Sequence, residues 1–121
     1  MASVSLTRRA FRDLHHIERY SIERWGKSVA EEYLDDIEQG LNRLRENPRL
    51  LRTKDGISPD FSLYRVREHF LVCTQSADRV YVLTIQHGSM DLPRRLAELE
   101  PQLLAEAELL RRALDKKSDE R

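Results

Sequence analysis

Basic side chains mark the part of the sequence where binding chemistry is easiest to place. The candidates are Arg65, Arg67, His69, His87, Arg94 and Arg95. Alternation along a strand places Arg65 and Arg67 on the same face, while His69 falls in the next turn and His87 ends a later strand. The last two arginines open a helix. Together these groups predict a cationic rim that binds phosphate or a protein carboxylate.

The same side chains also have a purely structural interpretation. Arg65 and Arg67 would pair with acidic side chains of a neighbouring helix, and His87 would bond to the backbone where its strand ends. Composition alone favours this second interpretation, because exposed ion pairs are common in solvated surfaces and contribute little free energy. Both interpretations stay open on the sequence alone.

Other chemistry finds less support. His15 and His16 are consecutive in a helical run, so they point about 100° apart and are expected at the surface rather than on a shared metal. Cys73 lies within an apolar run and is expected to be a buried structural thiol. No Gly-x-Ser-x-Gly, P-loop or dinucleotide glycine motif occurs in the sequence. We therefore expect neither a cofactor nor a metal.

The composition indicates one small domain. The chain has 121 residues, of which 40% are apolar and 35% charged. Its 21 basic and 21 acidic residues exclude a broadly basic nucleic-acid coat, although acidic groups prevail in 27–46 and basic groups in 49–95. The first residues lack the apolar core of a secretory signal, and no apolar run reaches about 18 residues. The expected location is the cytoplasm, with no membrane contact.

The secondary structure that must position these side chains begins with a short strand and two helices. Residues 3–6 alternate as a strand, and Thr7 is a suitable cap for a helix that ends near Gly26. Ser28 and Glu31 form a capping box for a second helix, which Asn47-Pro48 ends. The apolar stripe of this second helix is Ala30, Leu34, Ile37, Leu41 and Leu44. The short connection predicts an antiparallel helical hairpin.

Strands are expected after the hairpin. An edge strand or loop near Leu50–Lys54 precedes three β-rich runs, Ser62–Arg67, Phe70–Ser76 and Arg79–His87. The predicted turns of this meander are Glu68-His69 and Ala77-Asp78. Both alternating faces of the last run are apolar, which is typical of a strand covered on both sides.

A C-terminal helix follows the meander. Asp91 caps it, Pro93 lies in its first turn, and Pro101 is expected to interrupt it. The stripe beyond Pro101 is Leu103, Ala107, Leu110 and Leu114, and the charged tail 115–121 is expected to fray. This divides the chain into a domain of residues 1–100 and a helical extension of residues 101–121.

The predicted fold class is α+β, with an N-terminal helical hairpin packed on a small, mostly antiparallel sheet of three to five strands. The hairpin covers only one face of that sheet. The other face is left for the C-terminal helix, for a second copy or for a partner's segment, and the leucine stripe favours the C-terminal helix as core.

An ordered set of residues spans roughly residues 4–99 of this architecture. Its first part is Leu6-Thr7, Ala10, Asp13-Leu14, Ile17, Tyr20, Trp25-Gly26, Ala30, Tyr33, Leu41–Leu44 and Asn47-Pro48. Its second part is Tyr64-Arg65-Val66, His69, the segment 82–91 and Arg95-Leu96. On these residues the chain resembles the ParE/RelE superfamily of toxins from bacterial type II toxin–antitoxin pairs. The ending with His87, Met90-Asp91 and Arg95-Leu96 is most similar to the ParE branch.

The resemblance implies a RelE/ParE-like fold and a toxin that a cognate antitoxin holds inactive by wrapping a segment over it. Members of the ParE branch poison DNA gyrase, and members of the RelE branch cut mRNA on the ribosome. Arg65 matches the central basic position of the nucleases, and His87 stands at their last-strand position. No tyrosine occurs after Tyr81, so the nuclease set is incomplete.

The leading hypothesis is therefore a non-catalytic ParE-like toxin that inhibits gyrase, alone or in a homodimer or larger toxin–antitoxin assembly. One alternative is a ribosome-dependent mRNA endonuclease using Arg65 and His87. Another is a degenerate interaction domain without toxicity, for which the long C-terminal helix is the only hint. The candidates for target or antitoxin contacts are Arg65, Arg67, His69, His87, Met90, Asp91, Arg94 and Arg95.

Overall fold

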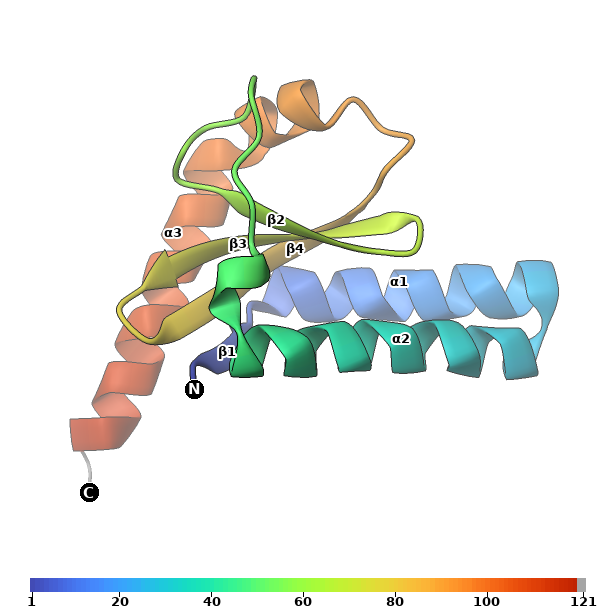
Figure 1. The fold of residues 1–121 in the computed structure, drawn as a ribbon, viewed down its shortest axis with the longest axis horizontal. Coiled ribbons are helices and arrows are strands. Elements are labelled where there is room, and N and C mark those ends of the chain that lie inside the picture. The colour runs from blue at the N-terminus through green and yellow to red at the C-terminus, as the bar shows by residue number, and fades with distance from the viewer. Residues whose placement is uncertain (120–121) are drawn as a thin grey trace.

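A computed structural model describes residues 1–119, with side chains described through residue 117. The elements, in chain order, are β1 (Ser3–Leu6), α1 (Arg8–Trp25), α2 (Lys27–Glu46), a 3₁₀ turn η1 (Pro48–Leu50), β2 (Ser62–Val66), β3 (His69–Ser76), β4 (Arg79–His87) and α3 (Leu92–Asp119). The four strands form one sheet in the order β1-β4-β3-β2, in which only β1 and β4 are parallel. The predicted α+β class is confirmed (Figure 1).

The helical hairpin is held by one side-chain cap and one glycine. The Ala10 N–H donates to the Thr7 hydroxyl at 3.1 Å, as predicted. Gly26 has φ +91°, ends α1 and begins α2, so the whole connection is this one residue. The predicted Ser28 capping box is wrong: α2 begins at Lys27 without any side-chain cap. Because Gly26 reverses the chain by itself, Ser28 already lies inside the helix.

The hairpin packs on one face of the sheet through a continuous apolar core. Its members include Ala10, Ile17, Tyr33, Ile37, Leu41, Leu44, Val66, Leu71, Val82 and Ile85. Gly40 of α2 lies close to the sheet, because a Cβ added there would lie 2.7 Å from Val66 Cγ2. Glycine at this position therefore lets α2 approach β2 closely.

The three strands of the meander match the prediction apart from the position of the first turn. The first turn is Arg67-Glu68, one residue earlier than predicted, so His69 belongs to β3; Arg67 takes a left-handed φ of 51°. The second turn, at 77–78, is confirmed. Of the two alternatives for residues 50–54, the loop is confirmed: after η1, which Asn47 caps, only a single bridge joins Arg52 to Leu63 of β2.

The second face of the sheet is covered by α3, which confirms the leading expectation for that helix (Figure 1). Its inward side chains Leu96, Leu99, Leu103 and Ala107 meet Phe61, Leu63, Val72, Tyr81 and Leu83. Pro101 does not interrupt α3, and the expected fraying from residue 115 is wrong as far as Asp119; residues 120–121 lie outside the described part. Buried leucines on both sides of exposed Pro101 hold the helix together across it.

No helix in the described part of the chain is long and apolar enough to cross a membrane.

Candidate functional site

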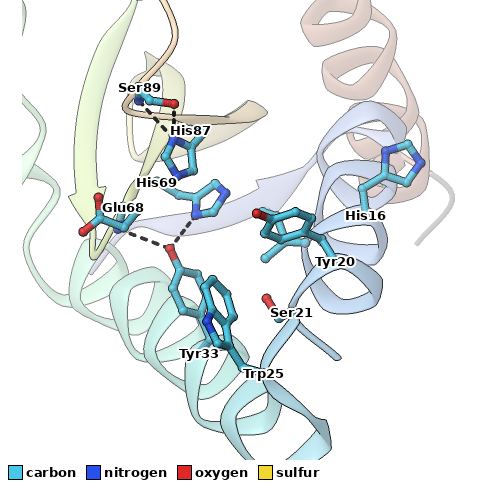
Figure 2. Close-up of a pocket in the computed structure, with 10 residues that line it drawn as sticks. His16, Tyr20, Ser21, Trp25, Tyr33, Glu68, His69, His87 and Ser89 are labelled. Atoms are coloured by element: carbon cyan, nitrogen blue, oxygen red, sulfur yellow. Dashed lines mark hydrogen bonds between the residues drawn. The ribbon is translucent and has the colours of Figure 1, made fainter. Parts of the chain in front are cut away.

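A pocket of about 560 Å³ opens between the helical hairpin and the adjoining ends of β3 and β4 (Figure 2). It is lined by His16, Ile17, Tyr20, Ser21 and Trp25 from α1, Tyr33 from α2, and Glu68, His69, His87 and Ser89 from the strand ends. Tyr20 and Trp25 stand edge to face with ring centroids 5.9 Å apart, and each is more than half exposed. The pocket therefore has polar groups at one end and an exposed aromatic wall at the other.

A hydrogen-bonded chain crosses the polar end of the pocket (Figure 2). The Glu68 backbone N–H donates to the Tyr33 hydroxyl oxygen at 3.2 Å, and the hydroxyl lies 2.5 Å from His69 Nδ1. A hydroxyl donates one hydrogen and accepts two, so the hydrogen between Tyr33 and His69 Nδ1 comes from either group, according to the tautomer of the ring.

Electrostatics keep both partners of this chain uncharged. Burial, followed by the neighbouring His87, lowers the pKa of His69 from 6.5 to about 4, against the opposing effect of Glu68. Burial also raises the pKa of the Tyr33 hydroxyl. At neutral pH the site therefore presents an imidazole and a phenol, which suit binding by hydrogen bonds and aromatic contact.

His87 completes the cluster from the end of β4. It is the cross-strand partner of His69, and the two rings stand edge to face with centroids 5.0 Å apart. Its Nδ1 accepts the backbone N–H of Ser89 at 3.0 Å and lies 2.7 Å from the Ser89 hydroxyl. The structural interpretation of His87, a bond to the backbone where the strand ends, is thus confirmed.

The two arginines predicted on one face point to different faces. Arg65 is the register partner of Phe70, holds its guanidinium 5.4 Å from that ring and donates to the Arg67 carbonyl at 2.7 Å. Arg67 lies in the turn, where its left-handed backbone redirects the side chain over the Tyr33 ring, 5.2 Å from the centroid, to an ion pair with Asp36 of α2. Pairing with a helix acid is confirmed for Arg67.

The strand register also separates the two residues of the nuclease hypothesis. His69 and His87 pair on the face that carries the hairpin, since Val66, the partner of His69 in β2, belongs to the core under the hairpin. Arg65 pairs with Phe70, which packs in the core under α3. Neighbouring positions in a strand point to opposite faces. Arg65 and His87 are therefore not brought into one site.

The remaining candidates gather at the start of α3. The Arg94 N–H donates to Asp91 Oδ1 at 3.4 Å, which confirms Asp91 as the cap. Arg94 and Arg95 pair with Glu98 at 3.4 and 3.9 Å, and Met90 is exposed. After β4 the connection runs to the side of the sheet away from the helical hairpin, where α3 begins (Figure 1). The predicted cationic rim is thus divided between the pocket and the α3 turn.

Several pocket residues were not among the predicted candidates. Tyr33 lies beside the apolar stripe of α2 and carries a polar atom, and Tyr20 and Trp25 are two large aromatic side chains near the end of α1. These residue types are the signal in the sequence that could have indicated the pocket. That they lie near His69 depends on how the hairpin packs against the sheet. His15 and His16 are both exposed, and His16 lies at the pocket.

Cys73 and the acidic groups add no reactive centre to this site. Cys73 is fully buried, and burial raises the pKa of its thiol, as expected for a structural cysteine. Among the described residues, no three His, Cys, Asp or Glu side chains are grouped so that they could hold a metal ion.

The fold and the site define a small α+β protein with a helical hairpin, a four-stranded sheet and a pocket with aromatic side chains between them. The sequence model of the family described as ParE toxin of type II toxin-antitoxin system, parDE, matches residues 4–92. The chain belongs to this family, and the expected ParE branch is confirmed.

Individual relatives agree with this assignment. The chain is 31% identical to Toxin ParE of Escherichia coli over 99 residues, which cover 81% of this chain and 96% of the relative. It is 30% identical to Toxin ParE1 of Mycobacterium tuberculosis over 84 residues, covering 69% and 86%. A chain from the solved chromosomal ParDE TA system of P. aeruginosa shares the fold, with a TM-score of 0.63, 18% identity and coverage of 72% of this chain and 96% of that one.

Proposed function

We propose that this ParE-family toxin inhibits DNA gyrase by binding it and is itself neutralised by a cognate antitoxin. The observation that carries the proposal is the family match over residues 4–92, with relatives named Toxin ParE. The structural neighbour from a ParDE TA system supports an antitoxin partner. Such a toxin acts in the cytoplasm, where its target lies, and needs neither metal nor cofactor.

The geometry supports inhibition by binding over catalysis. An RNA-cleaving site needs groups that activate the 2′-hydroxyl and stabilise developing charge within reach of the same phosphate. Arg65 and His87 lie on opposite faces of the sheet, and the charge of Arg67 is matched by Asp36. The exposed aromatic wall of Tyr20 and Trp25 is instead typical of a protein contact.

We assign the contacts with gyrase or the antitoxin to two places. The first is the pocket, with Arg67, His69 and His87. The second is the start of α3 with Met90, Asp91, Arg94 and Arg95, together with Arg65 on the α3 face of β2. The domain of residues 1–100 carries these contacts, and residues 101–119 continue α3 beyond it.

A supercoiling assay on relaxed plasmid with ATP tests the proposal. Purified, folded protein should block supercoiling or trap double-strand breaks, and addition of the antitoxin should restore normal activity. The variant Trp25→Ala removes part of the aromatic wall and should weaken inhibition, while Val29→Ala, a change at another exposed apolar residue, serves as the matched control.

Unaffected gyrase in the presence of folded protein contradicts the proposal. Mapping of mRNA cleavage on ribosomes then tests the nuclease alternative, for which both Arg65→Ala and His87→Gln must abolish cleavage without lowering the melting temperature. Harmless expression of the folded protein in cells indicates the interaction domain without toxicity.

A further inference from the structure

Helix α3 carries more apolar surface than the sheet covers. Its inward stripe is Leu96, Leu99, Leu103 and Ala107. A second set, Glu106, Leu109, Leu110 and Ala113, recurs at helical spacing on another side of α3 and lies along a groove. Leu109 in this set is 66% exposed. Leu110 also packs partly against the core under α3, so the exposed Leu109 and Ala113 are the apolar side chains of this set that the fold does not account for.

The facing wall of the groove is the beginning of α1. It is lined there by Leu6, Thr7, Arg8, Arg9, Phe11 and Arg12, and its volume is about 500 Å³. Phe11 is 54% exposed, so the groove contains two large apolar side chains in contact with water, one from each helix. Arg9 joins the two walls by a two-pronged ion pair with Glu106, at 2.8 and 2.9 Å.

The charge of the groove is positive. Arg9 is matched by Glu106, but Arg8 and Arg12 make no ion pair within the part of the chain whose side chains are described. An occupant must therefore offer apolar side chains for Phe11 and Leu109 together with carboxylates for the two arginines. The exposed apolar residues and the Glu106 carboxylate disfavour a phosphate backbone, which offers no apolar surface for Phe11 and Leu109 and is repelled by a carboxylate.

We propose that this groove between α1 and α3 docks an acidic amphipathic helix of a partner protein. The mode is a helix laid into an apolar groove, with acidic residues of the partner against the arginine rim. A second copy of this chain fits less well, because a two-fold contact through the groove brings Arg8 and Arg12 towards the same arginines. The family match ends at residue 92, before the α3 wall, so family membership does not imply this site.

Binding of two designed peptides to the full chain tests the proposal. Each is a labelled helix of about 14 residues, or four turns, with leucines at i, i+3, i+4 and i+7 and with either glutamates or lysines beside them. Fluorescence anisotropy should show that the glutamate peptide binds, that added salt weakens it, and that the lysine peptide does not bind. Circular dichroism of every variant confirms the fold.

Matched variants locate the contact. The double variant Arg8→Glu/Arg12→Glu should weaken the glutamate peptide at least about tenfold. Leu109→Ser should also weaken it, through lost apolar contact. The controls are Arg19→Glu, a charge reversal elsewhere on exposed α1, and Val29→Ser, a polar change at an exposed apolar residue of α2; both should bind as the unaltered chain does.

Three results overturn the proposal. One is failure of the glutamate peptide to bind, or binding that the groove variants leave unchanged. Another is equal or tighter binding of the lysine peptide or of a short DNA duplex. The third is dimerisation in sedimentation velocity that Leu109→Ser abolishes, since this assigns the groove to a second copy. None of these measurements depends on gyrase, so they are independent of the proposed function.

Discussion

The packing of α3 on the sheet predicts a large difference between two leucines of the same helix. Leu103 is 0% exposed and lies in the core between α3 and the sheet, whereas Leu109 is 66% exposed. Both are changed to alanine, so the helix propensity changes equally in the two variants and cancels in the comparison. Their difference measures what the sheet-facing position contributes.

The expected magnitude follows from burial. Truncating a fully buried leucine removes apolar contacts and leaves a cavity, at a cost of about 3 kcal/mol within a usual range of about 2–5 kcal/mol. That is a large part of the free energy of unfolding of a small domain, which is about 5–15 kcal/mol. Leu109→Ala should change the free energy of unfolding by no more than about 0.5 kcal/mol.

Urea denaturation followed by circular dichroism measures both variants. With a slope of about 1.5–2 kcal/mol per molar, Leu103→Ala should lower the midpoint by about 1.5–2 M, and Leu109→Ala should leave it nearly unchanged. Equal midpoints for the two variants refute the packing of α3 on the sheet. A changed slope for Leu103→Ala instead indicates that α3 unfolds separately from the rest.

Three further predictions concern the hairpin and the pocket. Gly40→Ala places a Cβ against Val66 and should cost about 1–3 kcal/mol, measured as a lower urea midpoint; an unchanged midpoint contradicts the close approach of α2 to β2. Tyr33→Phe leaves the Glu68 N–H and His69 Nδ1 without their partner and should cost about 1–2 kcal/mol by the same method, whereas a neutral effect would falsify the hydrogen-bonded chain. The lowered pKa of His69 means that the unfolded chain takes up a proton first as pH falls, so stability is retained above pH 6.5 and declines from there to about pH 4. After allowance for solvent screening, the loss in the free energy of unfolding between these two pH values is about 1–2 kcal/mol. When the free energy of unfolding is measured as a function of pH, the His69→Gln variant should lack this part of the decline.

The helical hairpin and the meander were predictable because their signals are local. Ala30, Ile37 and Leu44 repeat at the helical period, and Asn47-Pro48 ends the helix by fixing the backbone. The strands are rich in β-branched residues, and their bounds differ from the prediction only at the two ends beside the first turn, by one residue each. The boundary at the first turn of the meander was misplaced because it depends on the backbone conformation of one residue. Arg67 adopts a left-handed φ that its side chain does not favour, and no glycine announced the turn.

The pocket and the continuity of α3 could not be predicted, because both depend on tertiary packing. Tyr33 and His69 are 36 residues apart, and their contact requires the register of β2 on β3 and the seating of α2 on the sheet. Pro101 normally breaks a helix, but burial of Leu99 and Leu103 against the sheet offsets that cost. Arg65 and His87 were grouped as basic residues, and only the register assigns them to different faces.

The parallel pairing of the first strand determines when this toxin acquires its fold during synthesis. Ser3–Leu6 pairs with residues 79–82 of β4, so a chain growing from its N-terminus carries β1 without a partner until β4 has left the ribosome. Such a distant pairing forms late, because a long loop must close first. A translation product that stops before β4 lacks the strand at the centre of the sheet, and the nascent toxin is therefore incomplete for most of the time it takes to be made.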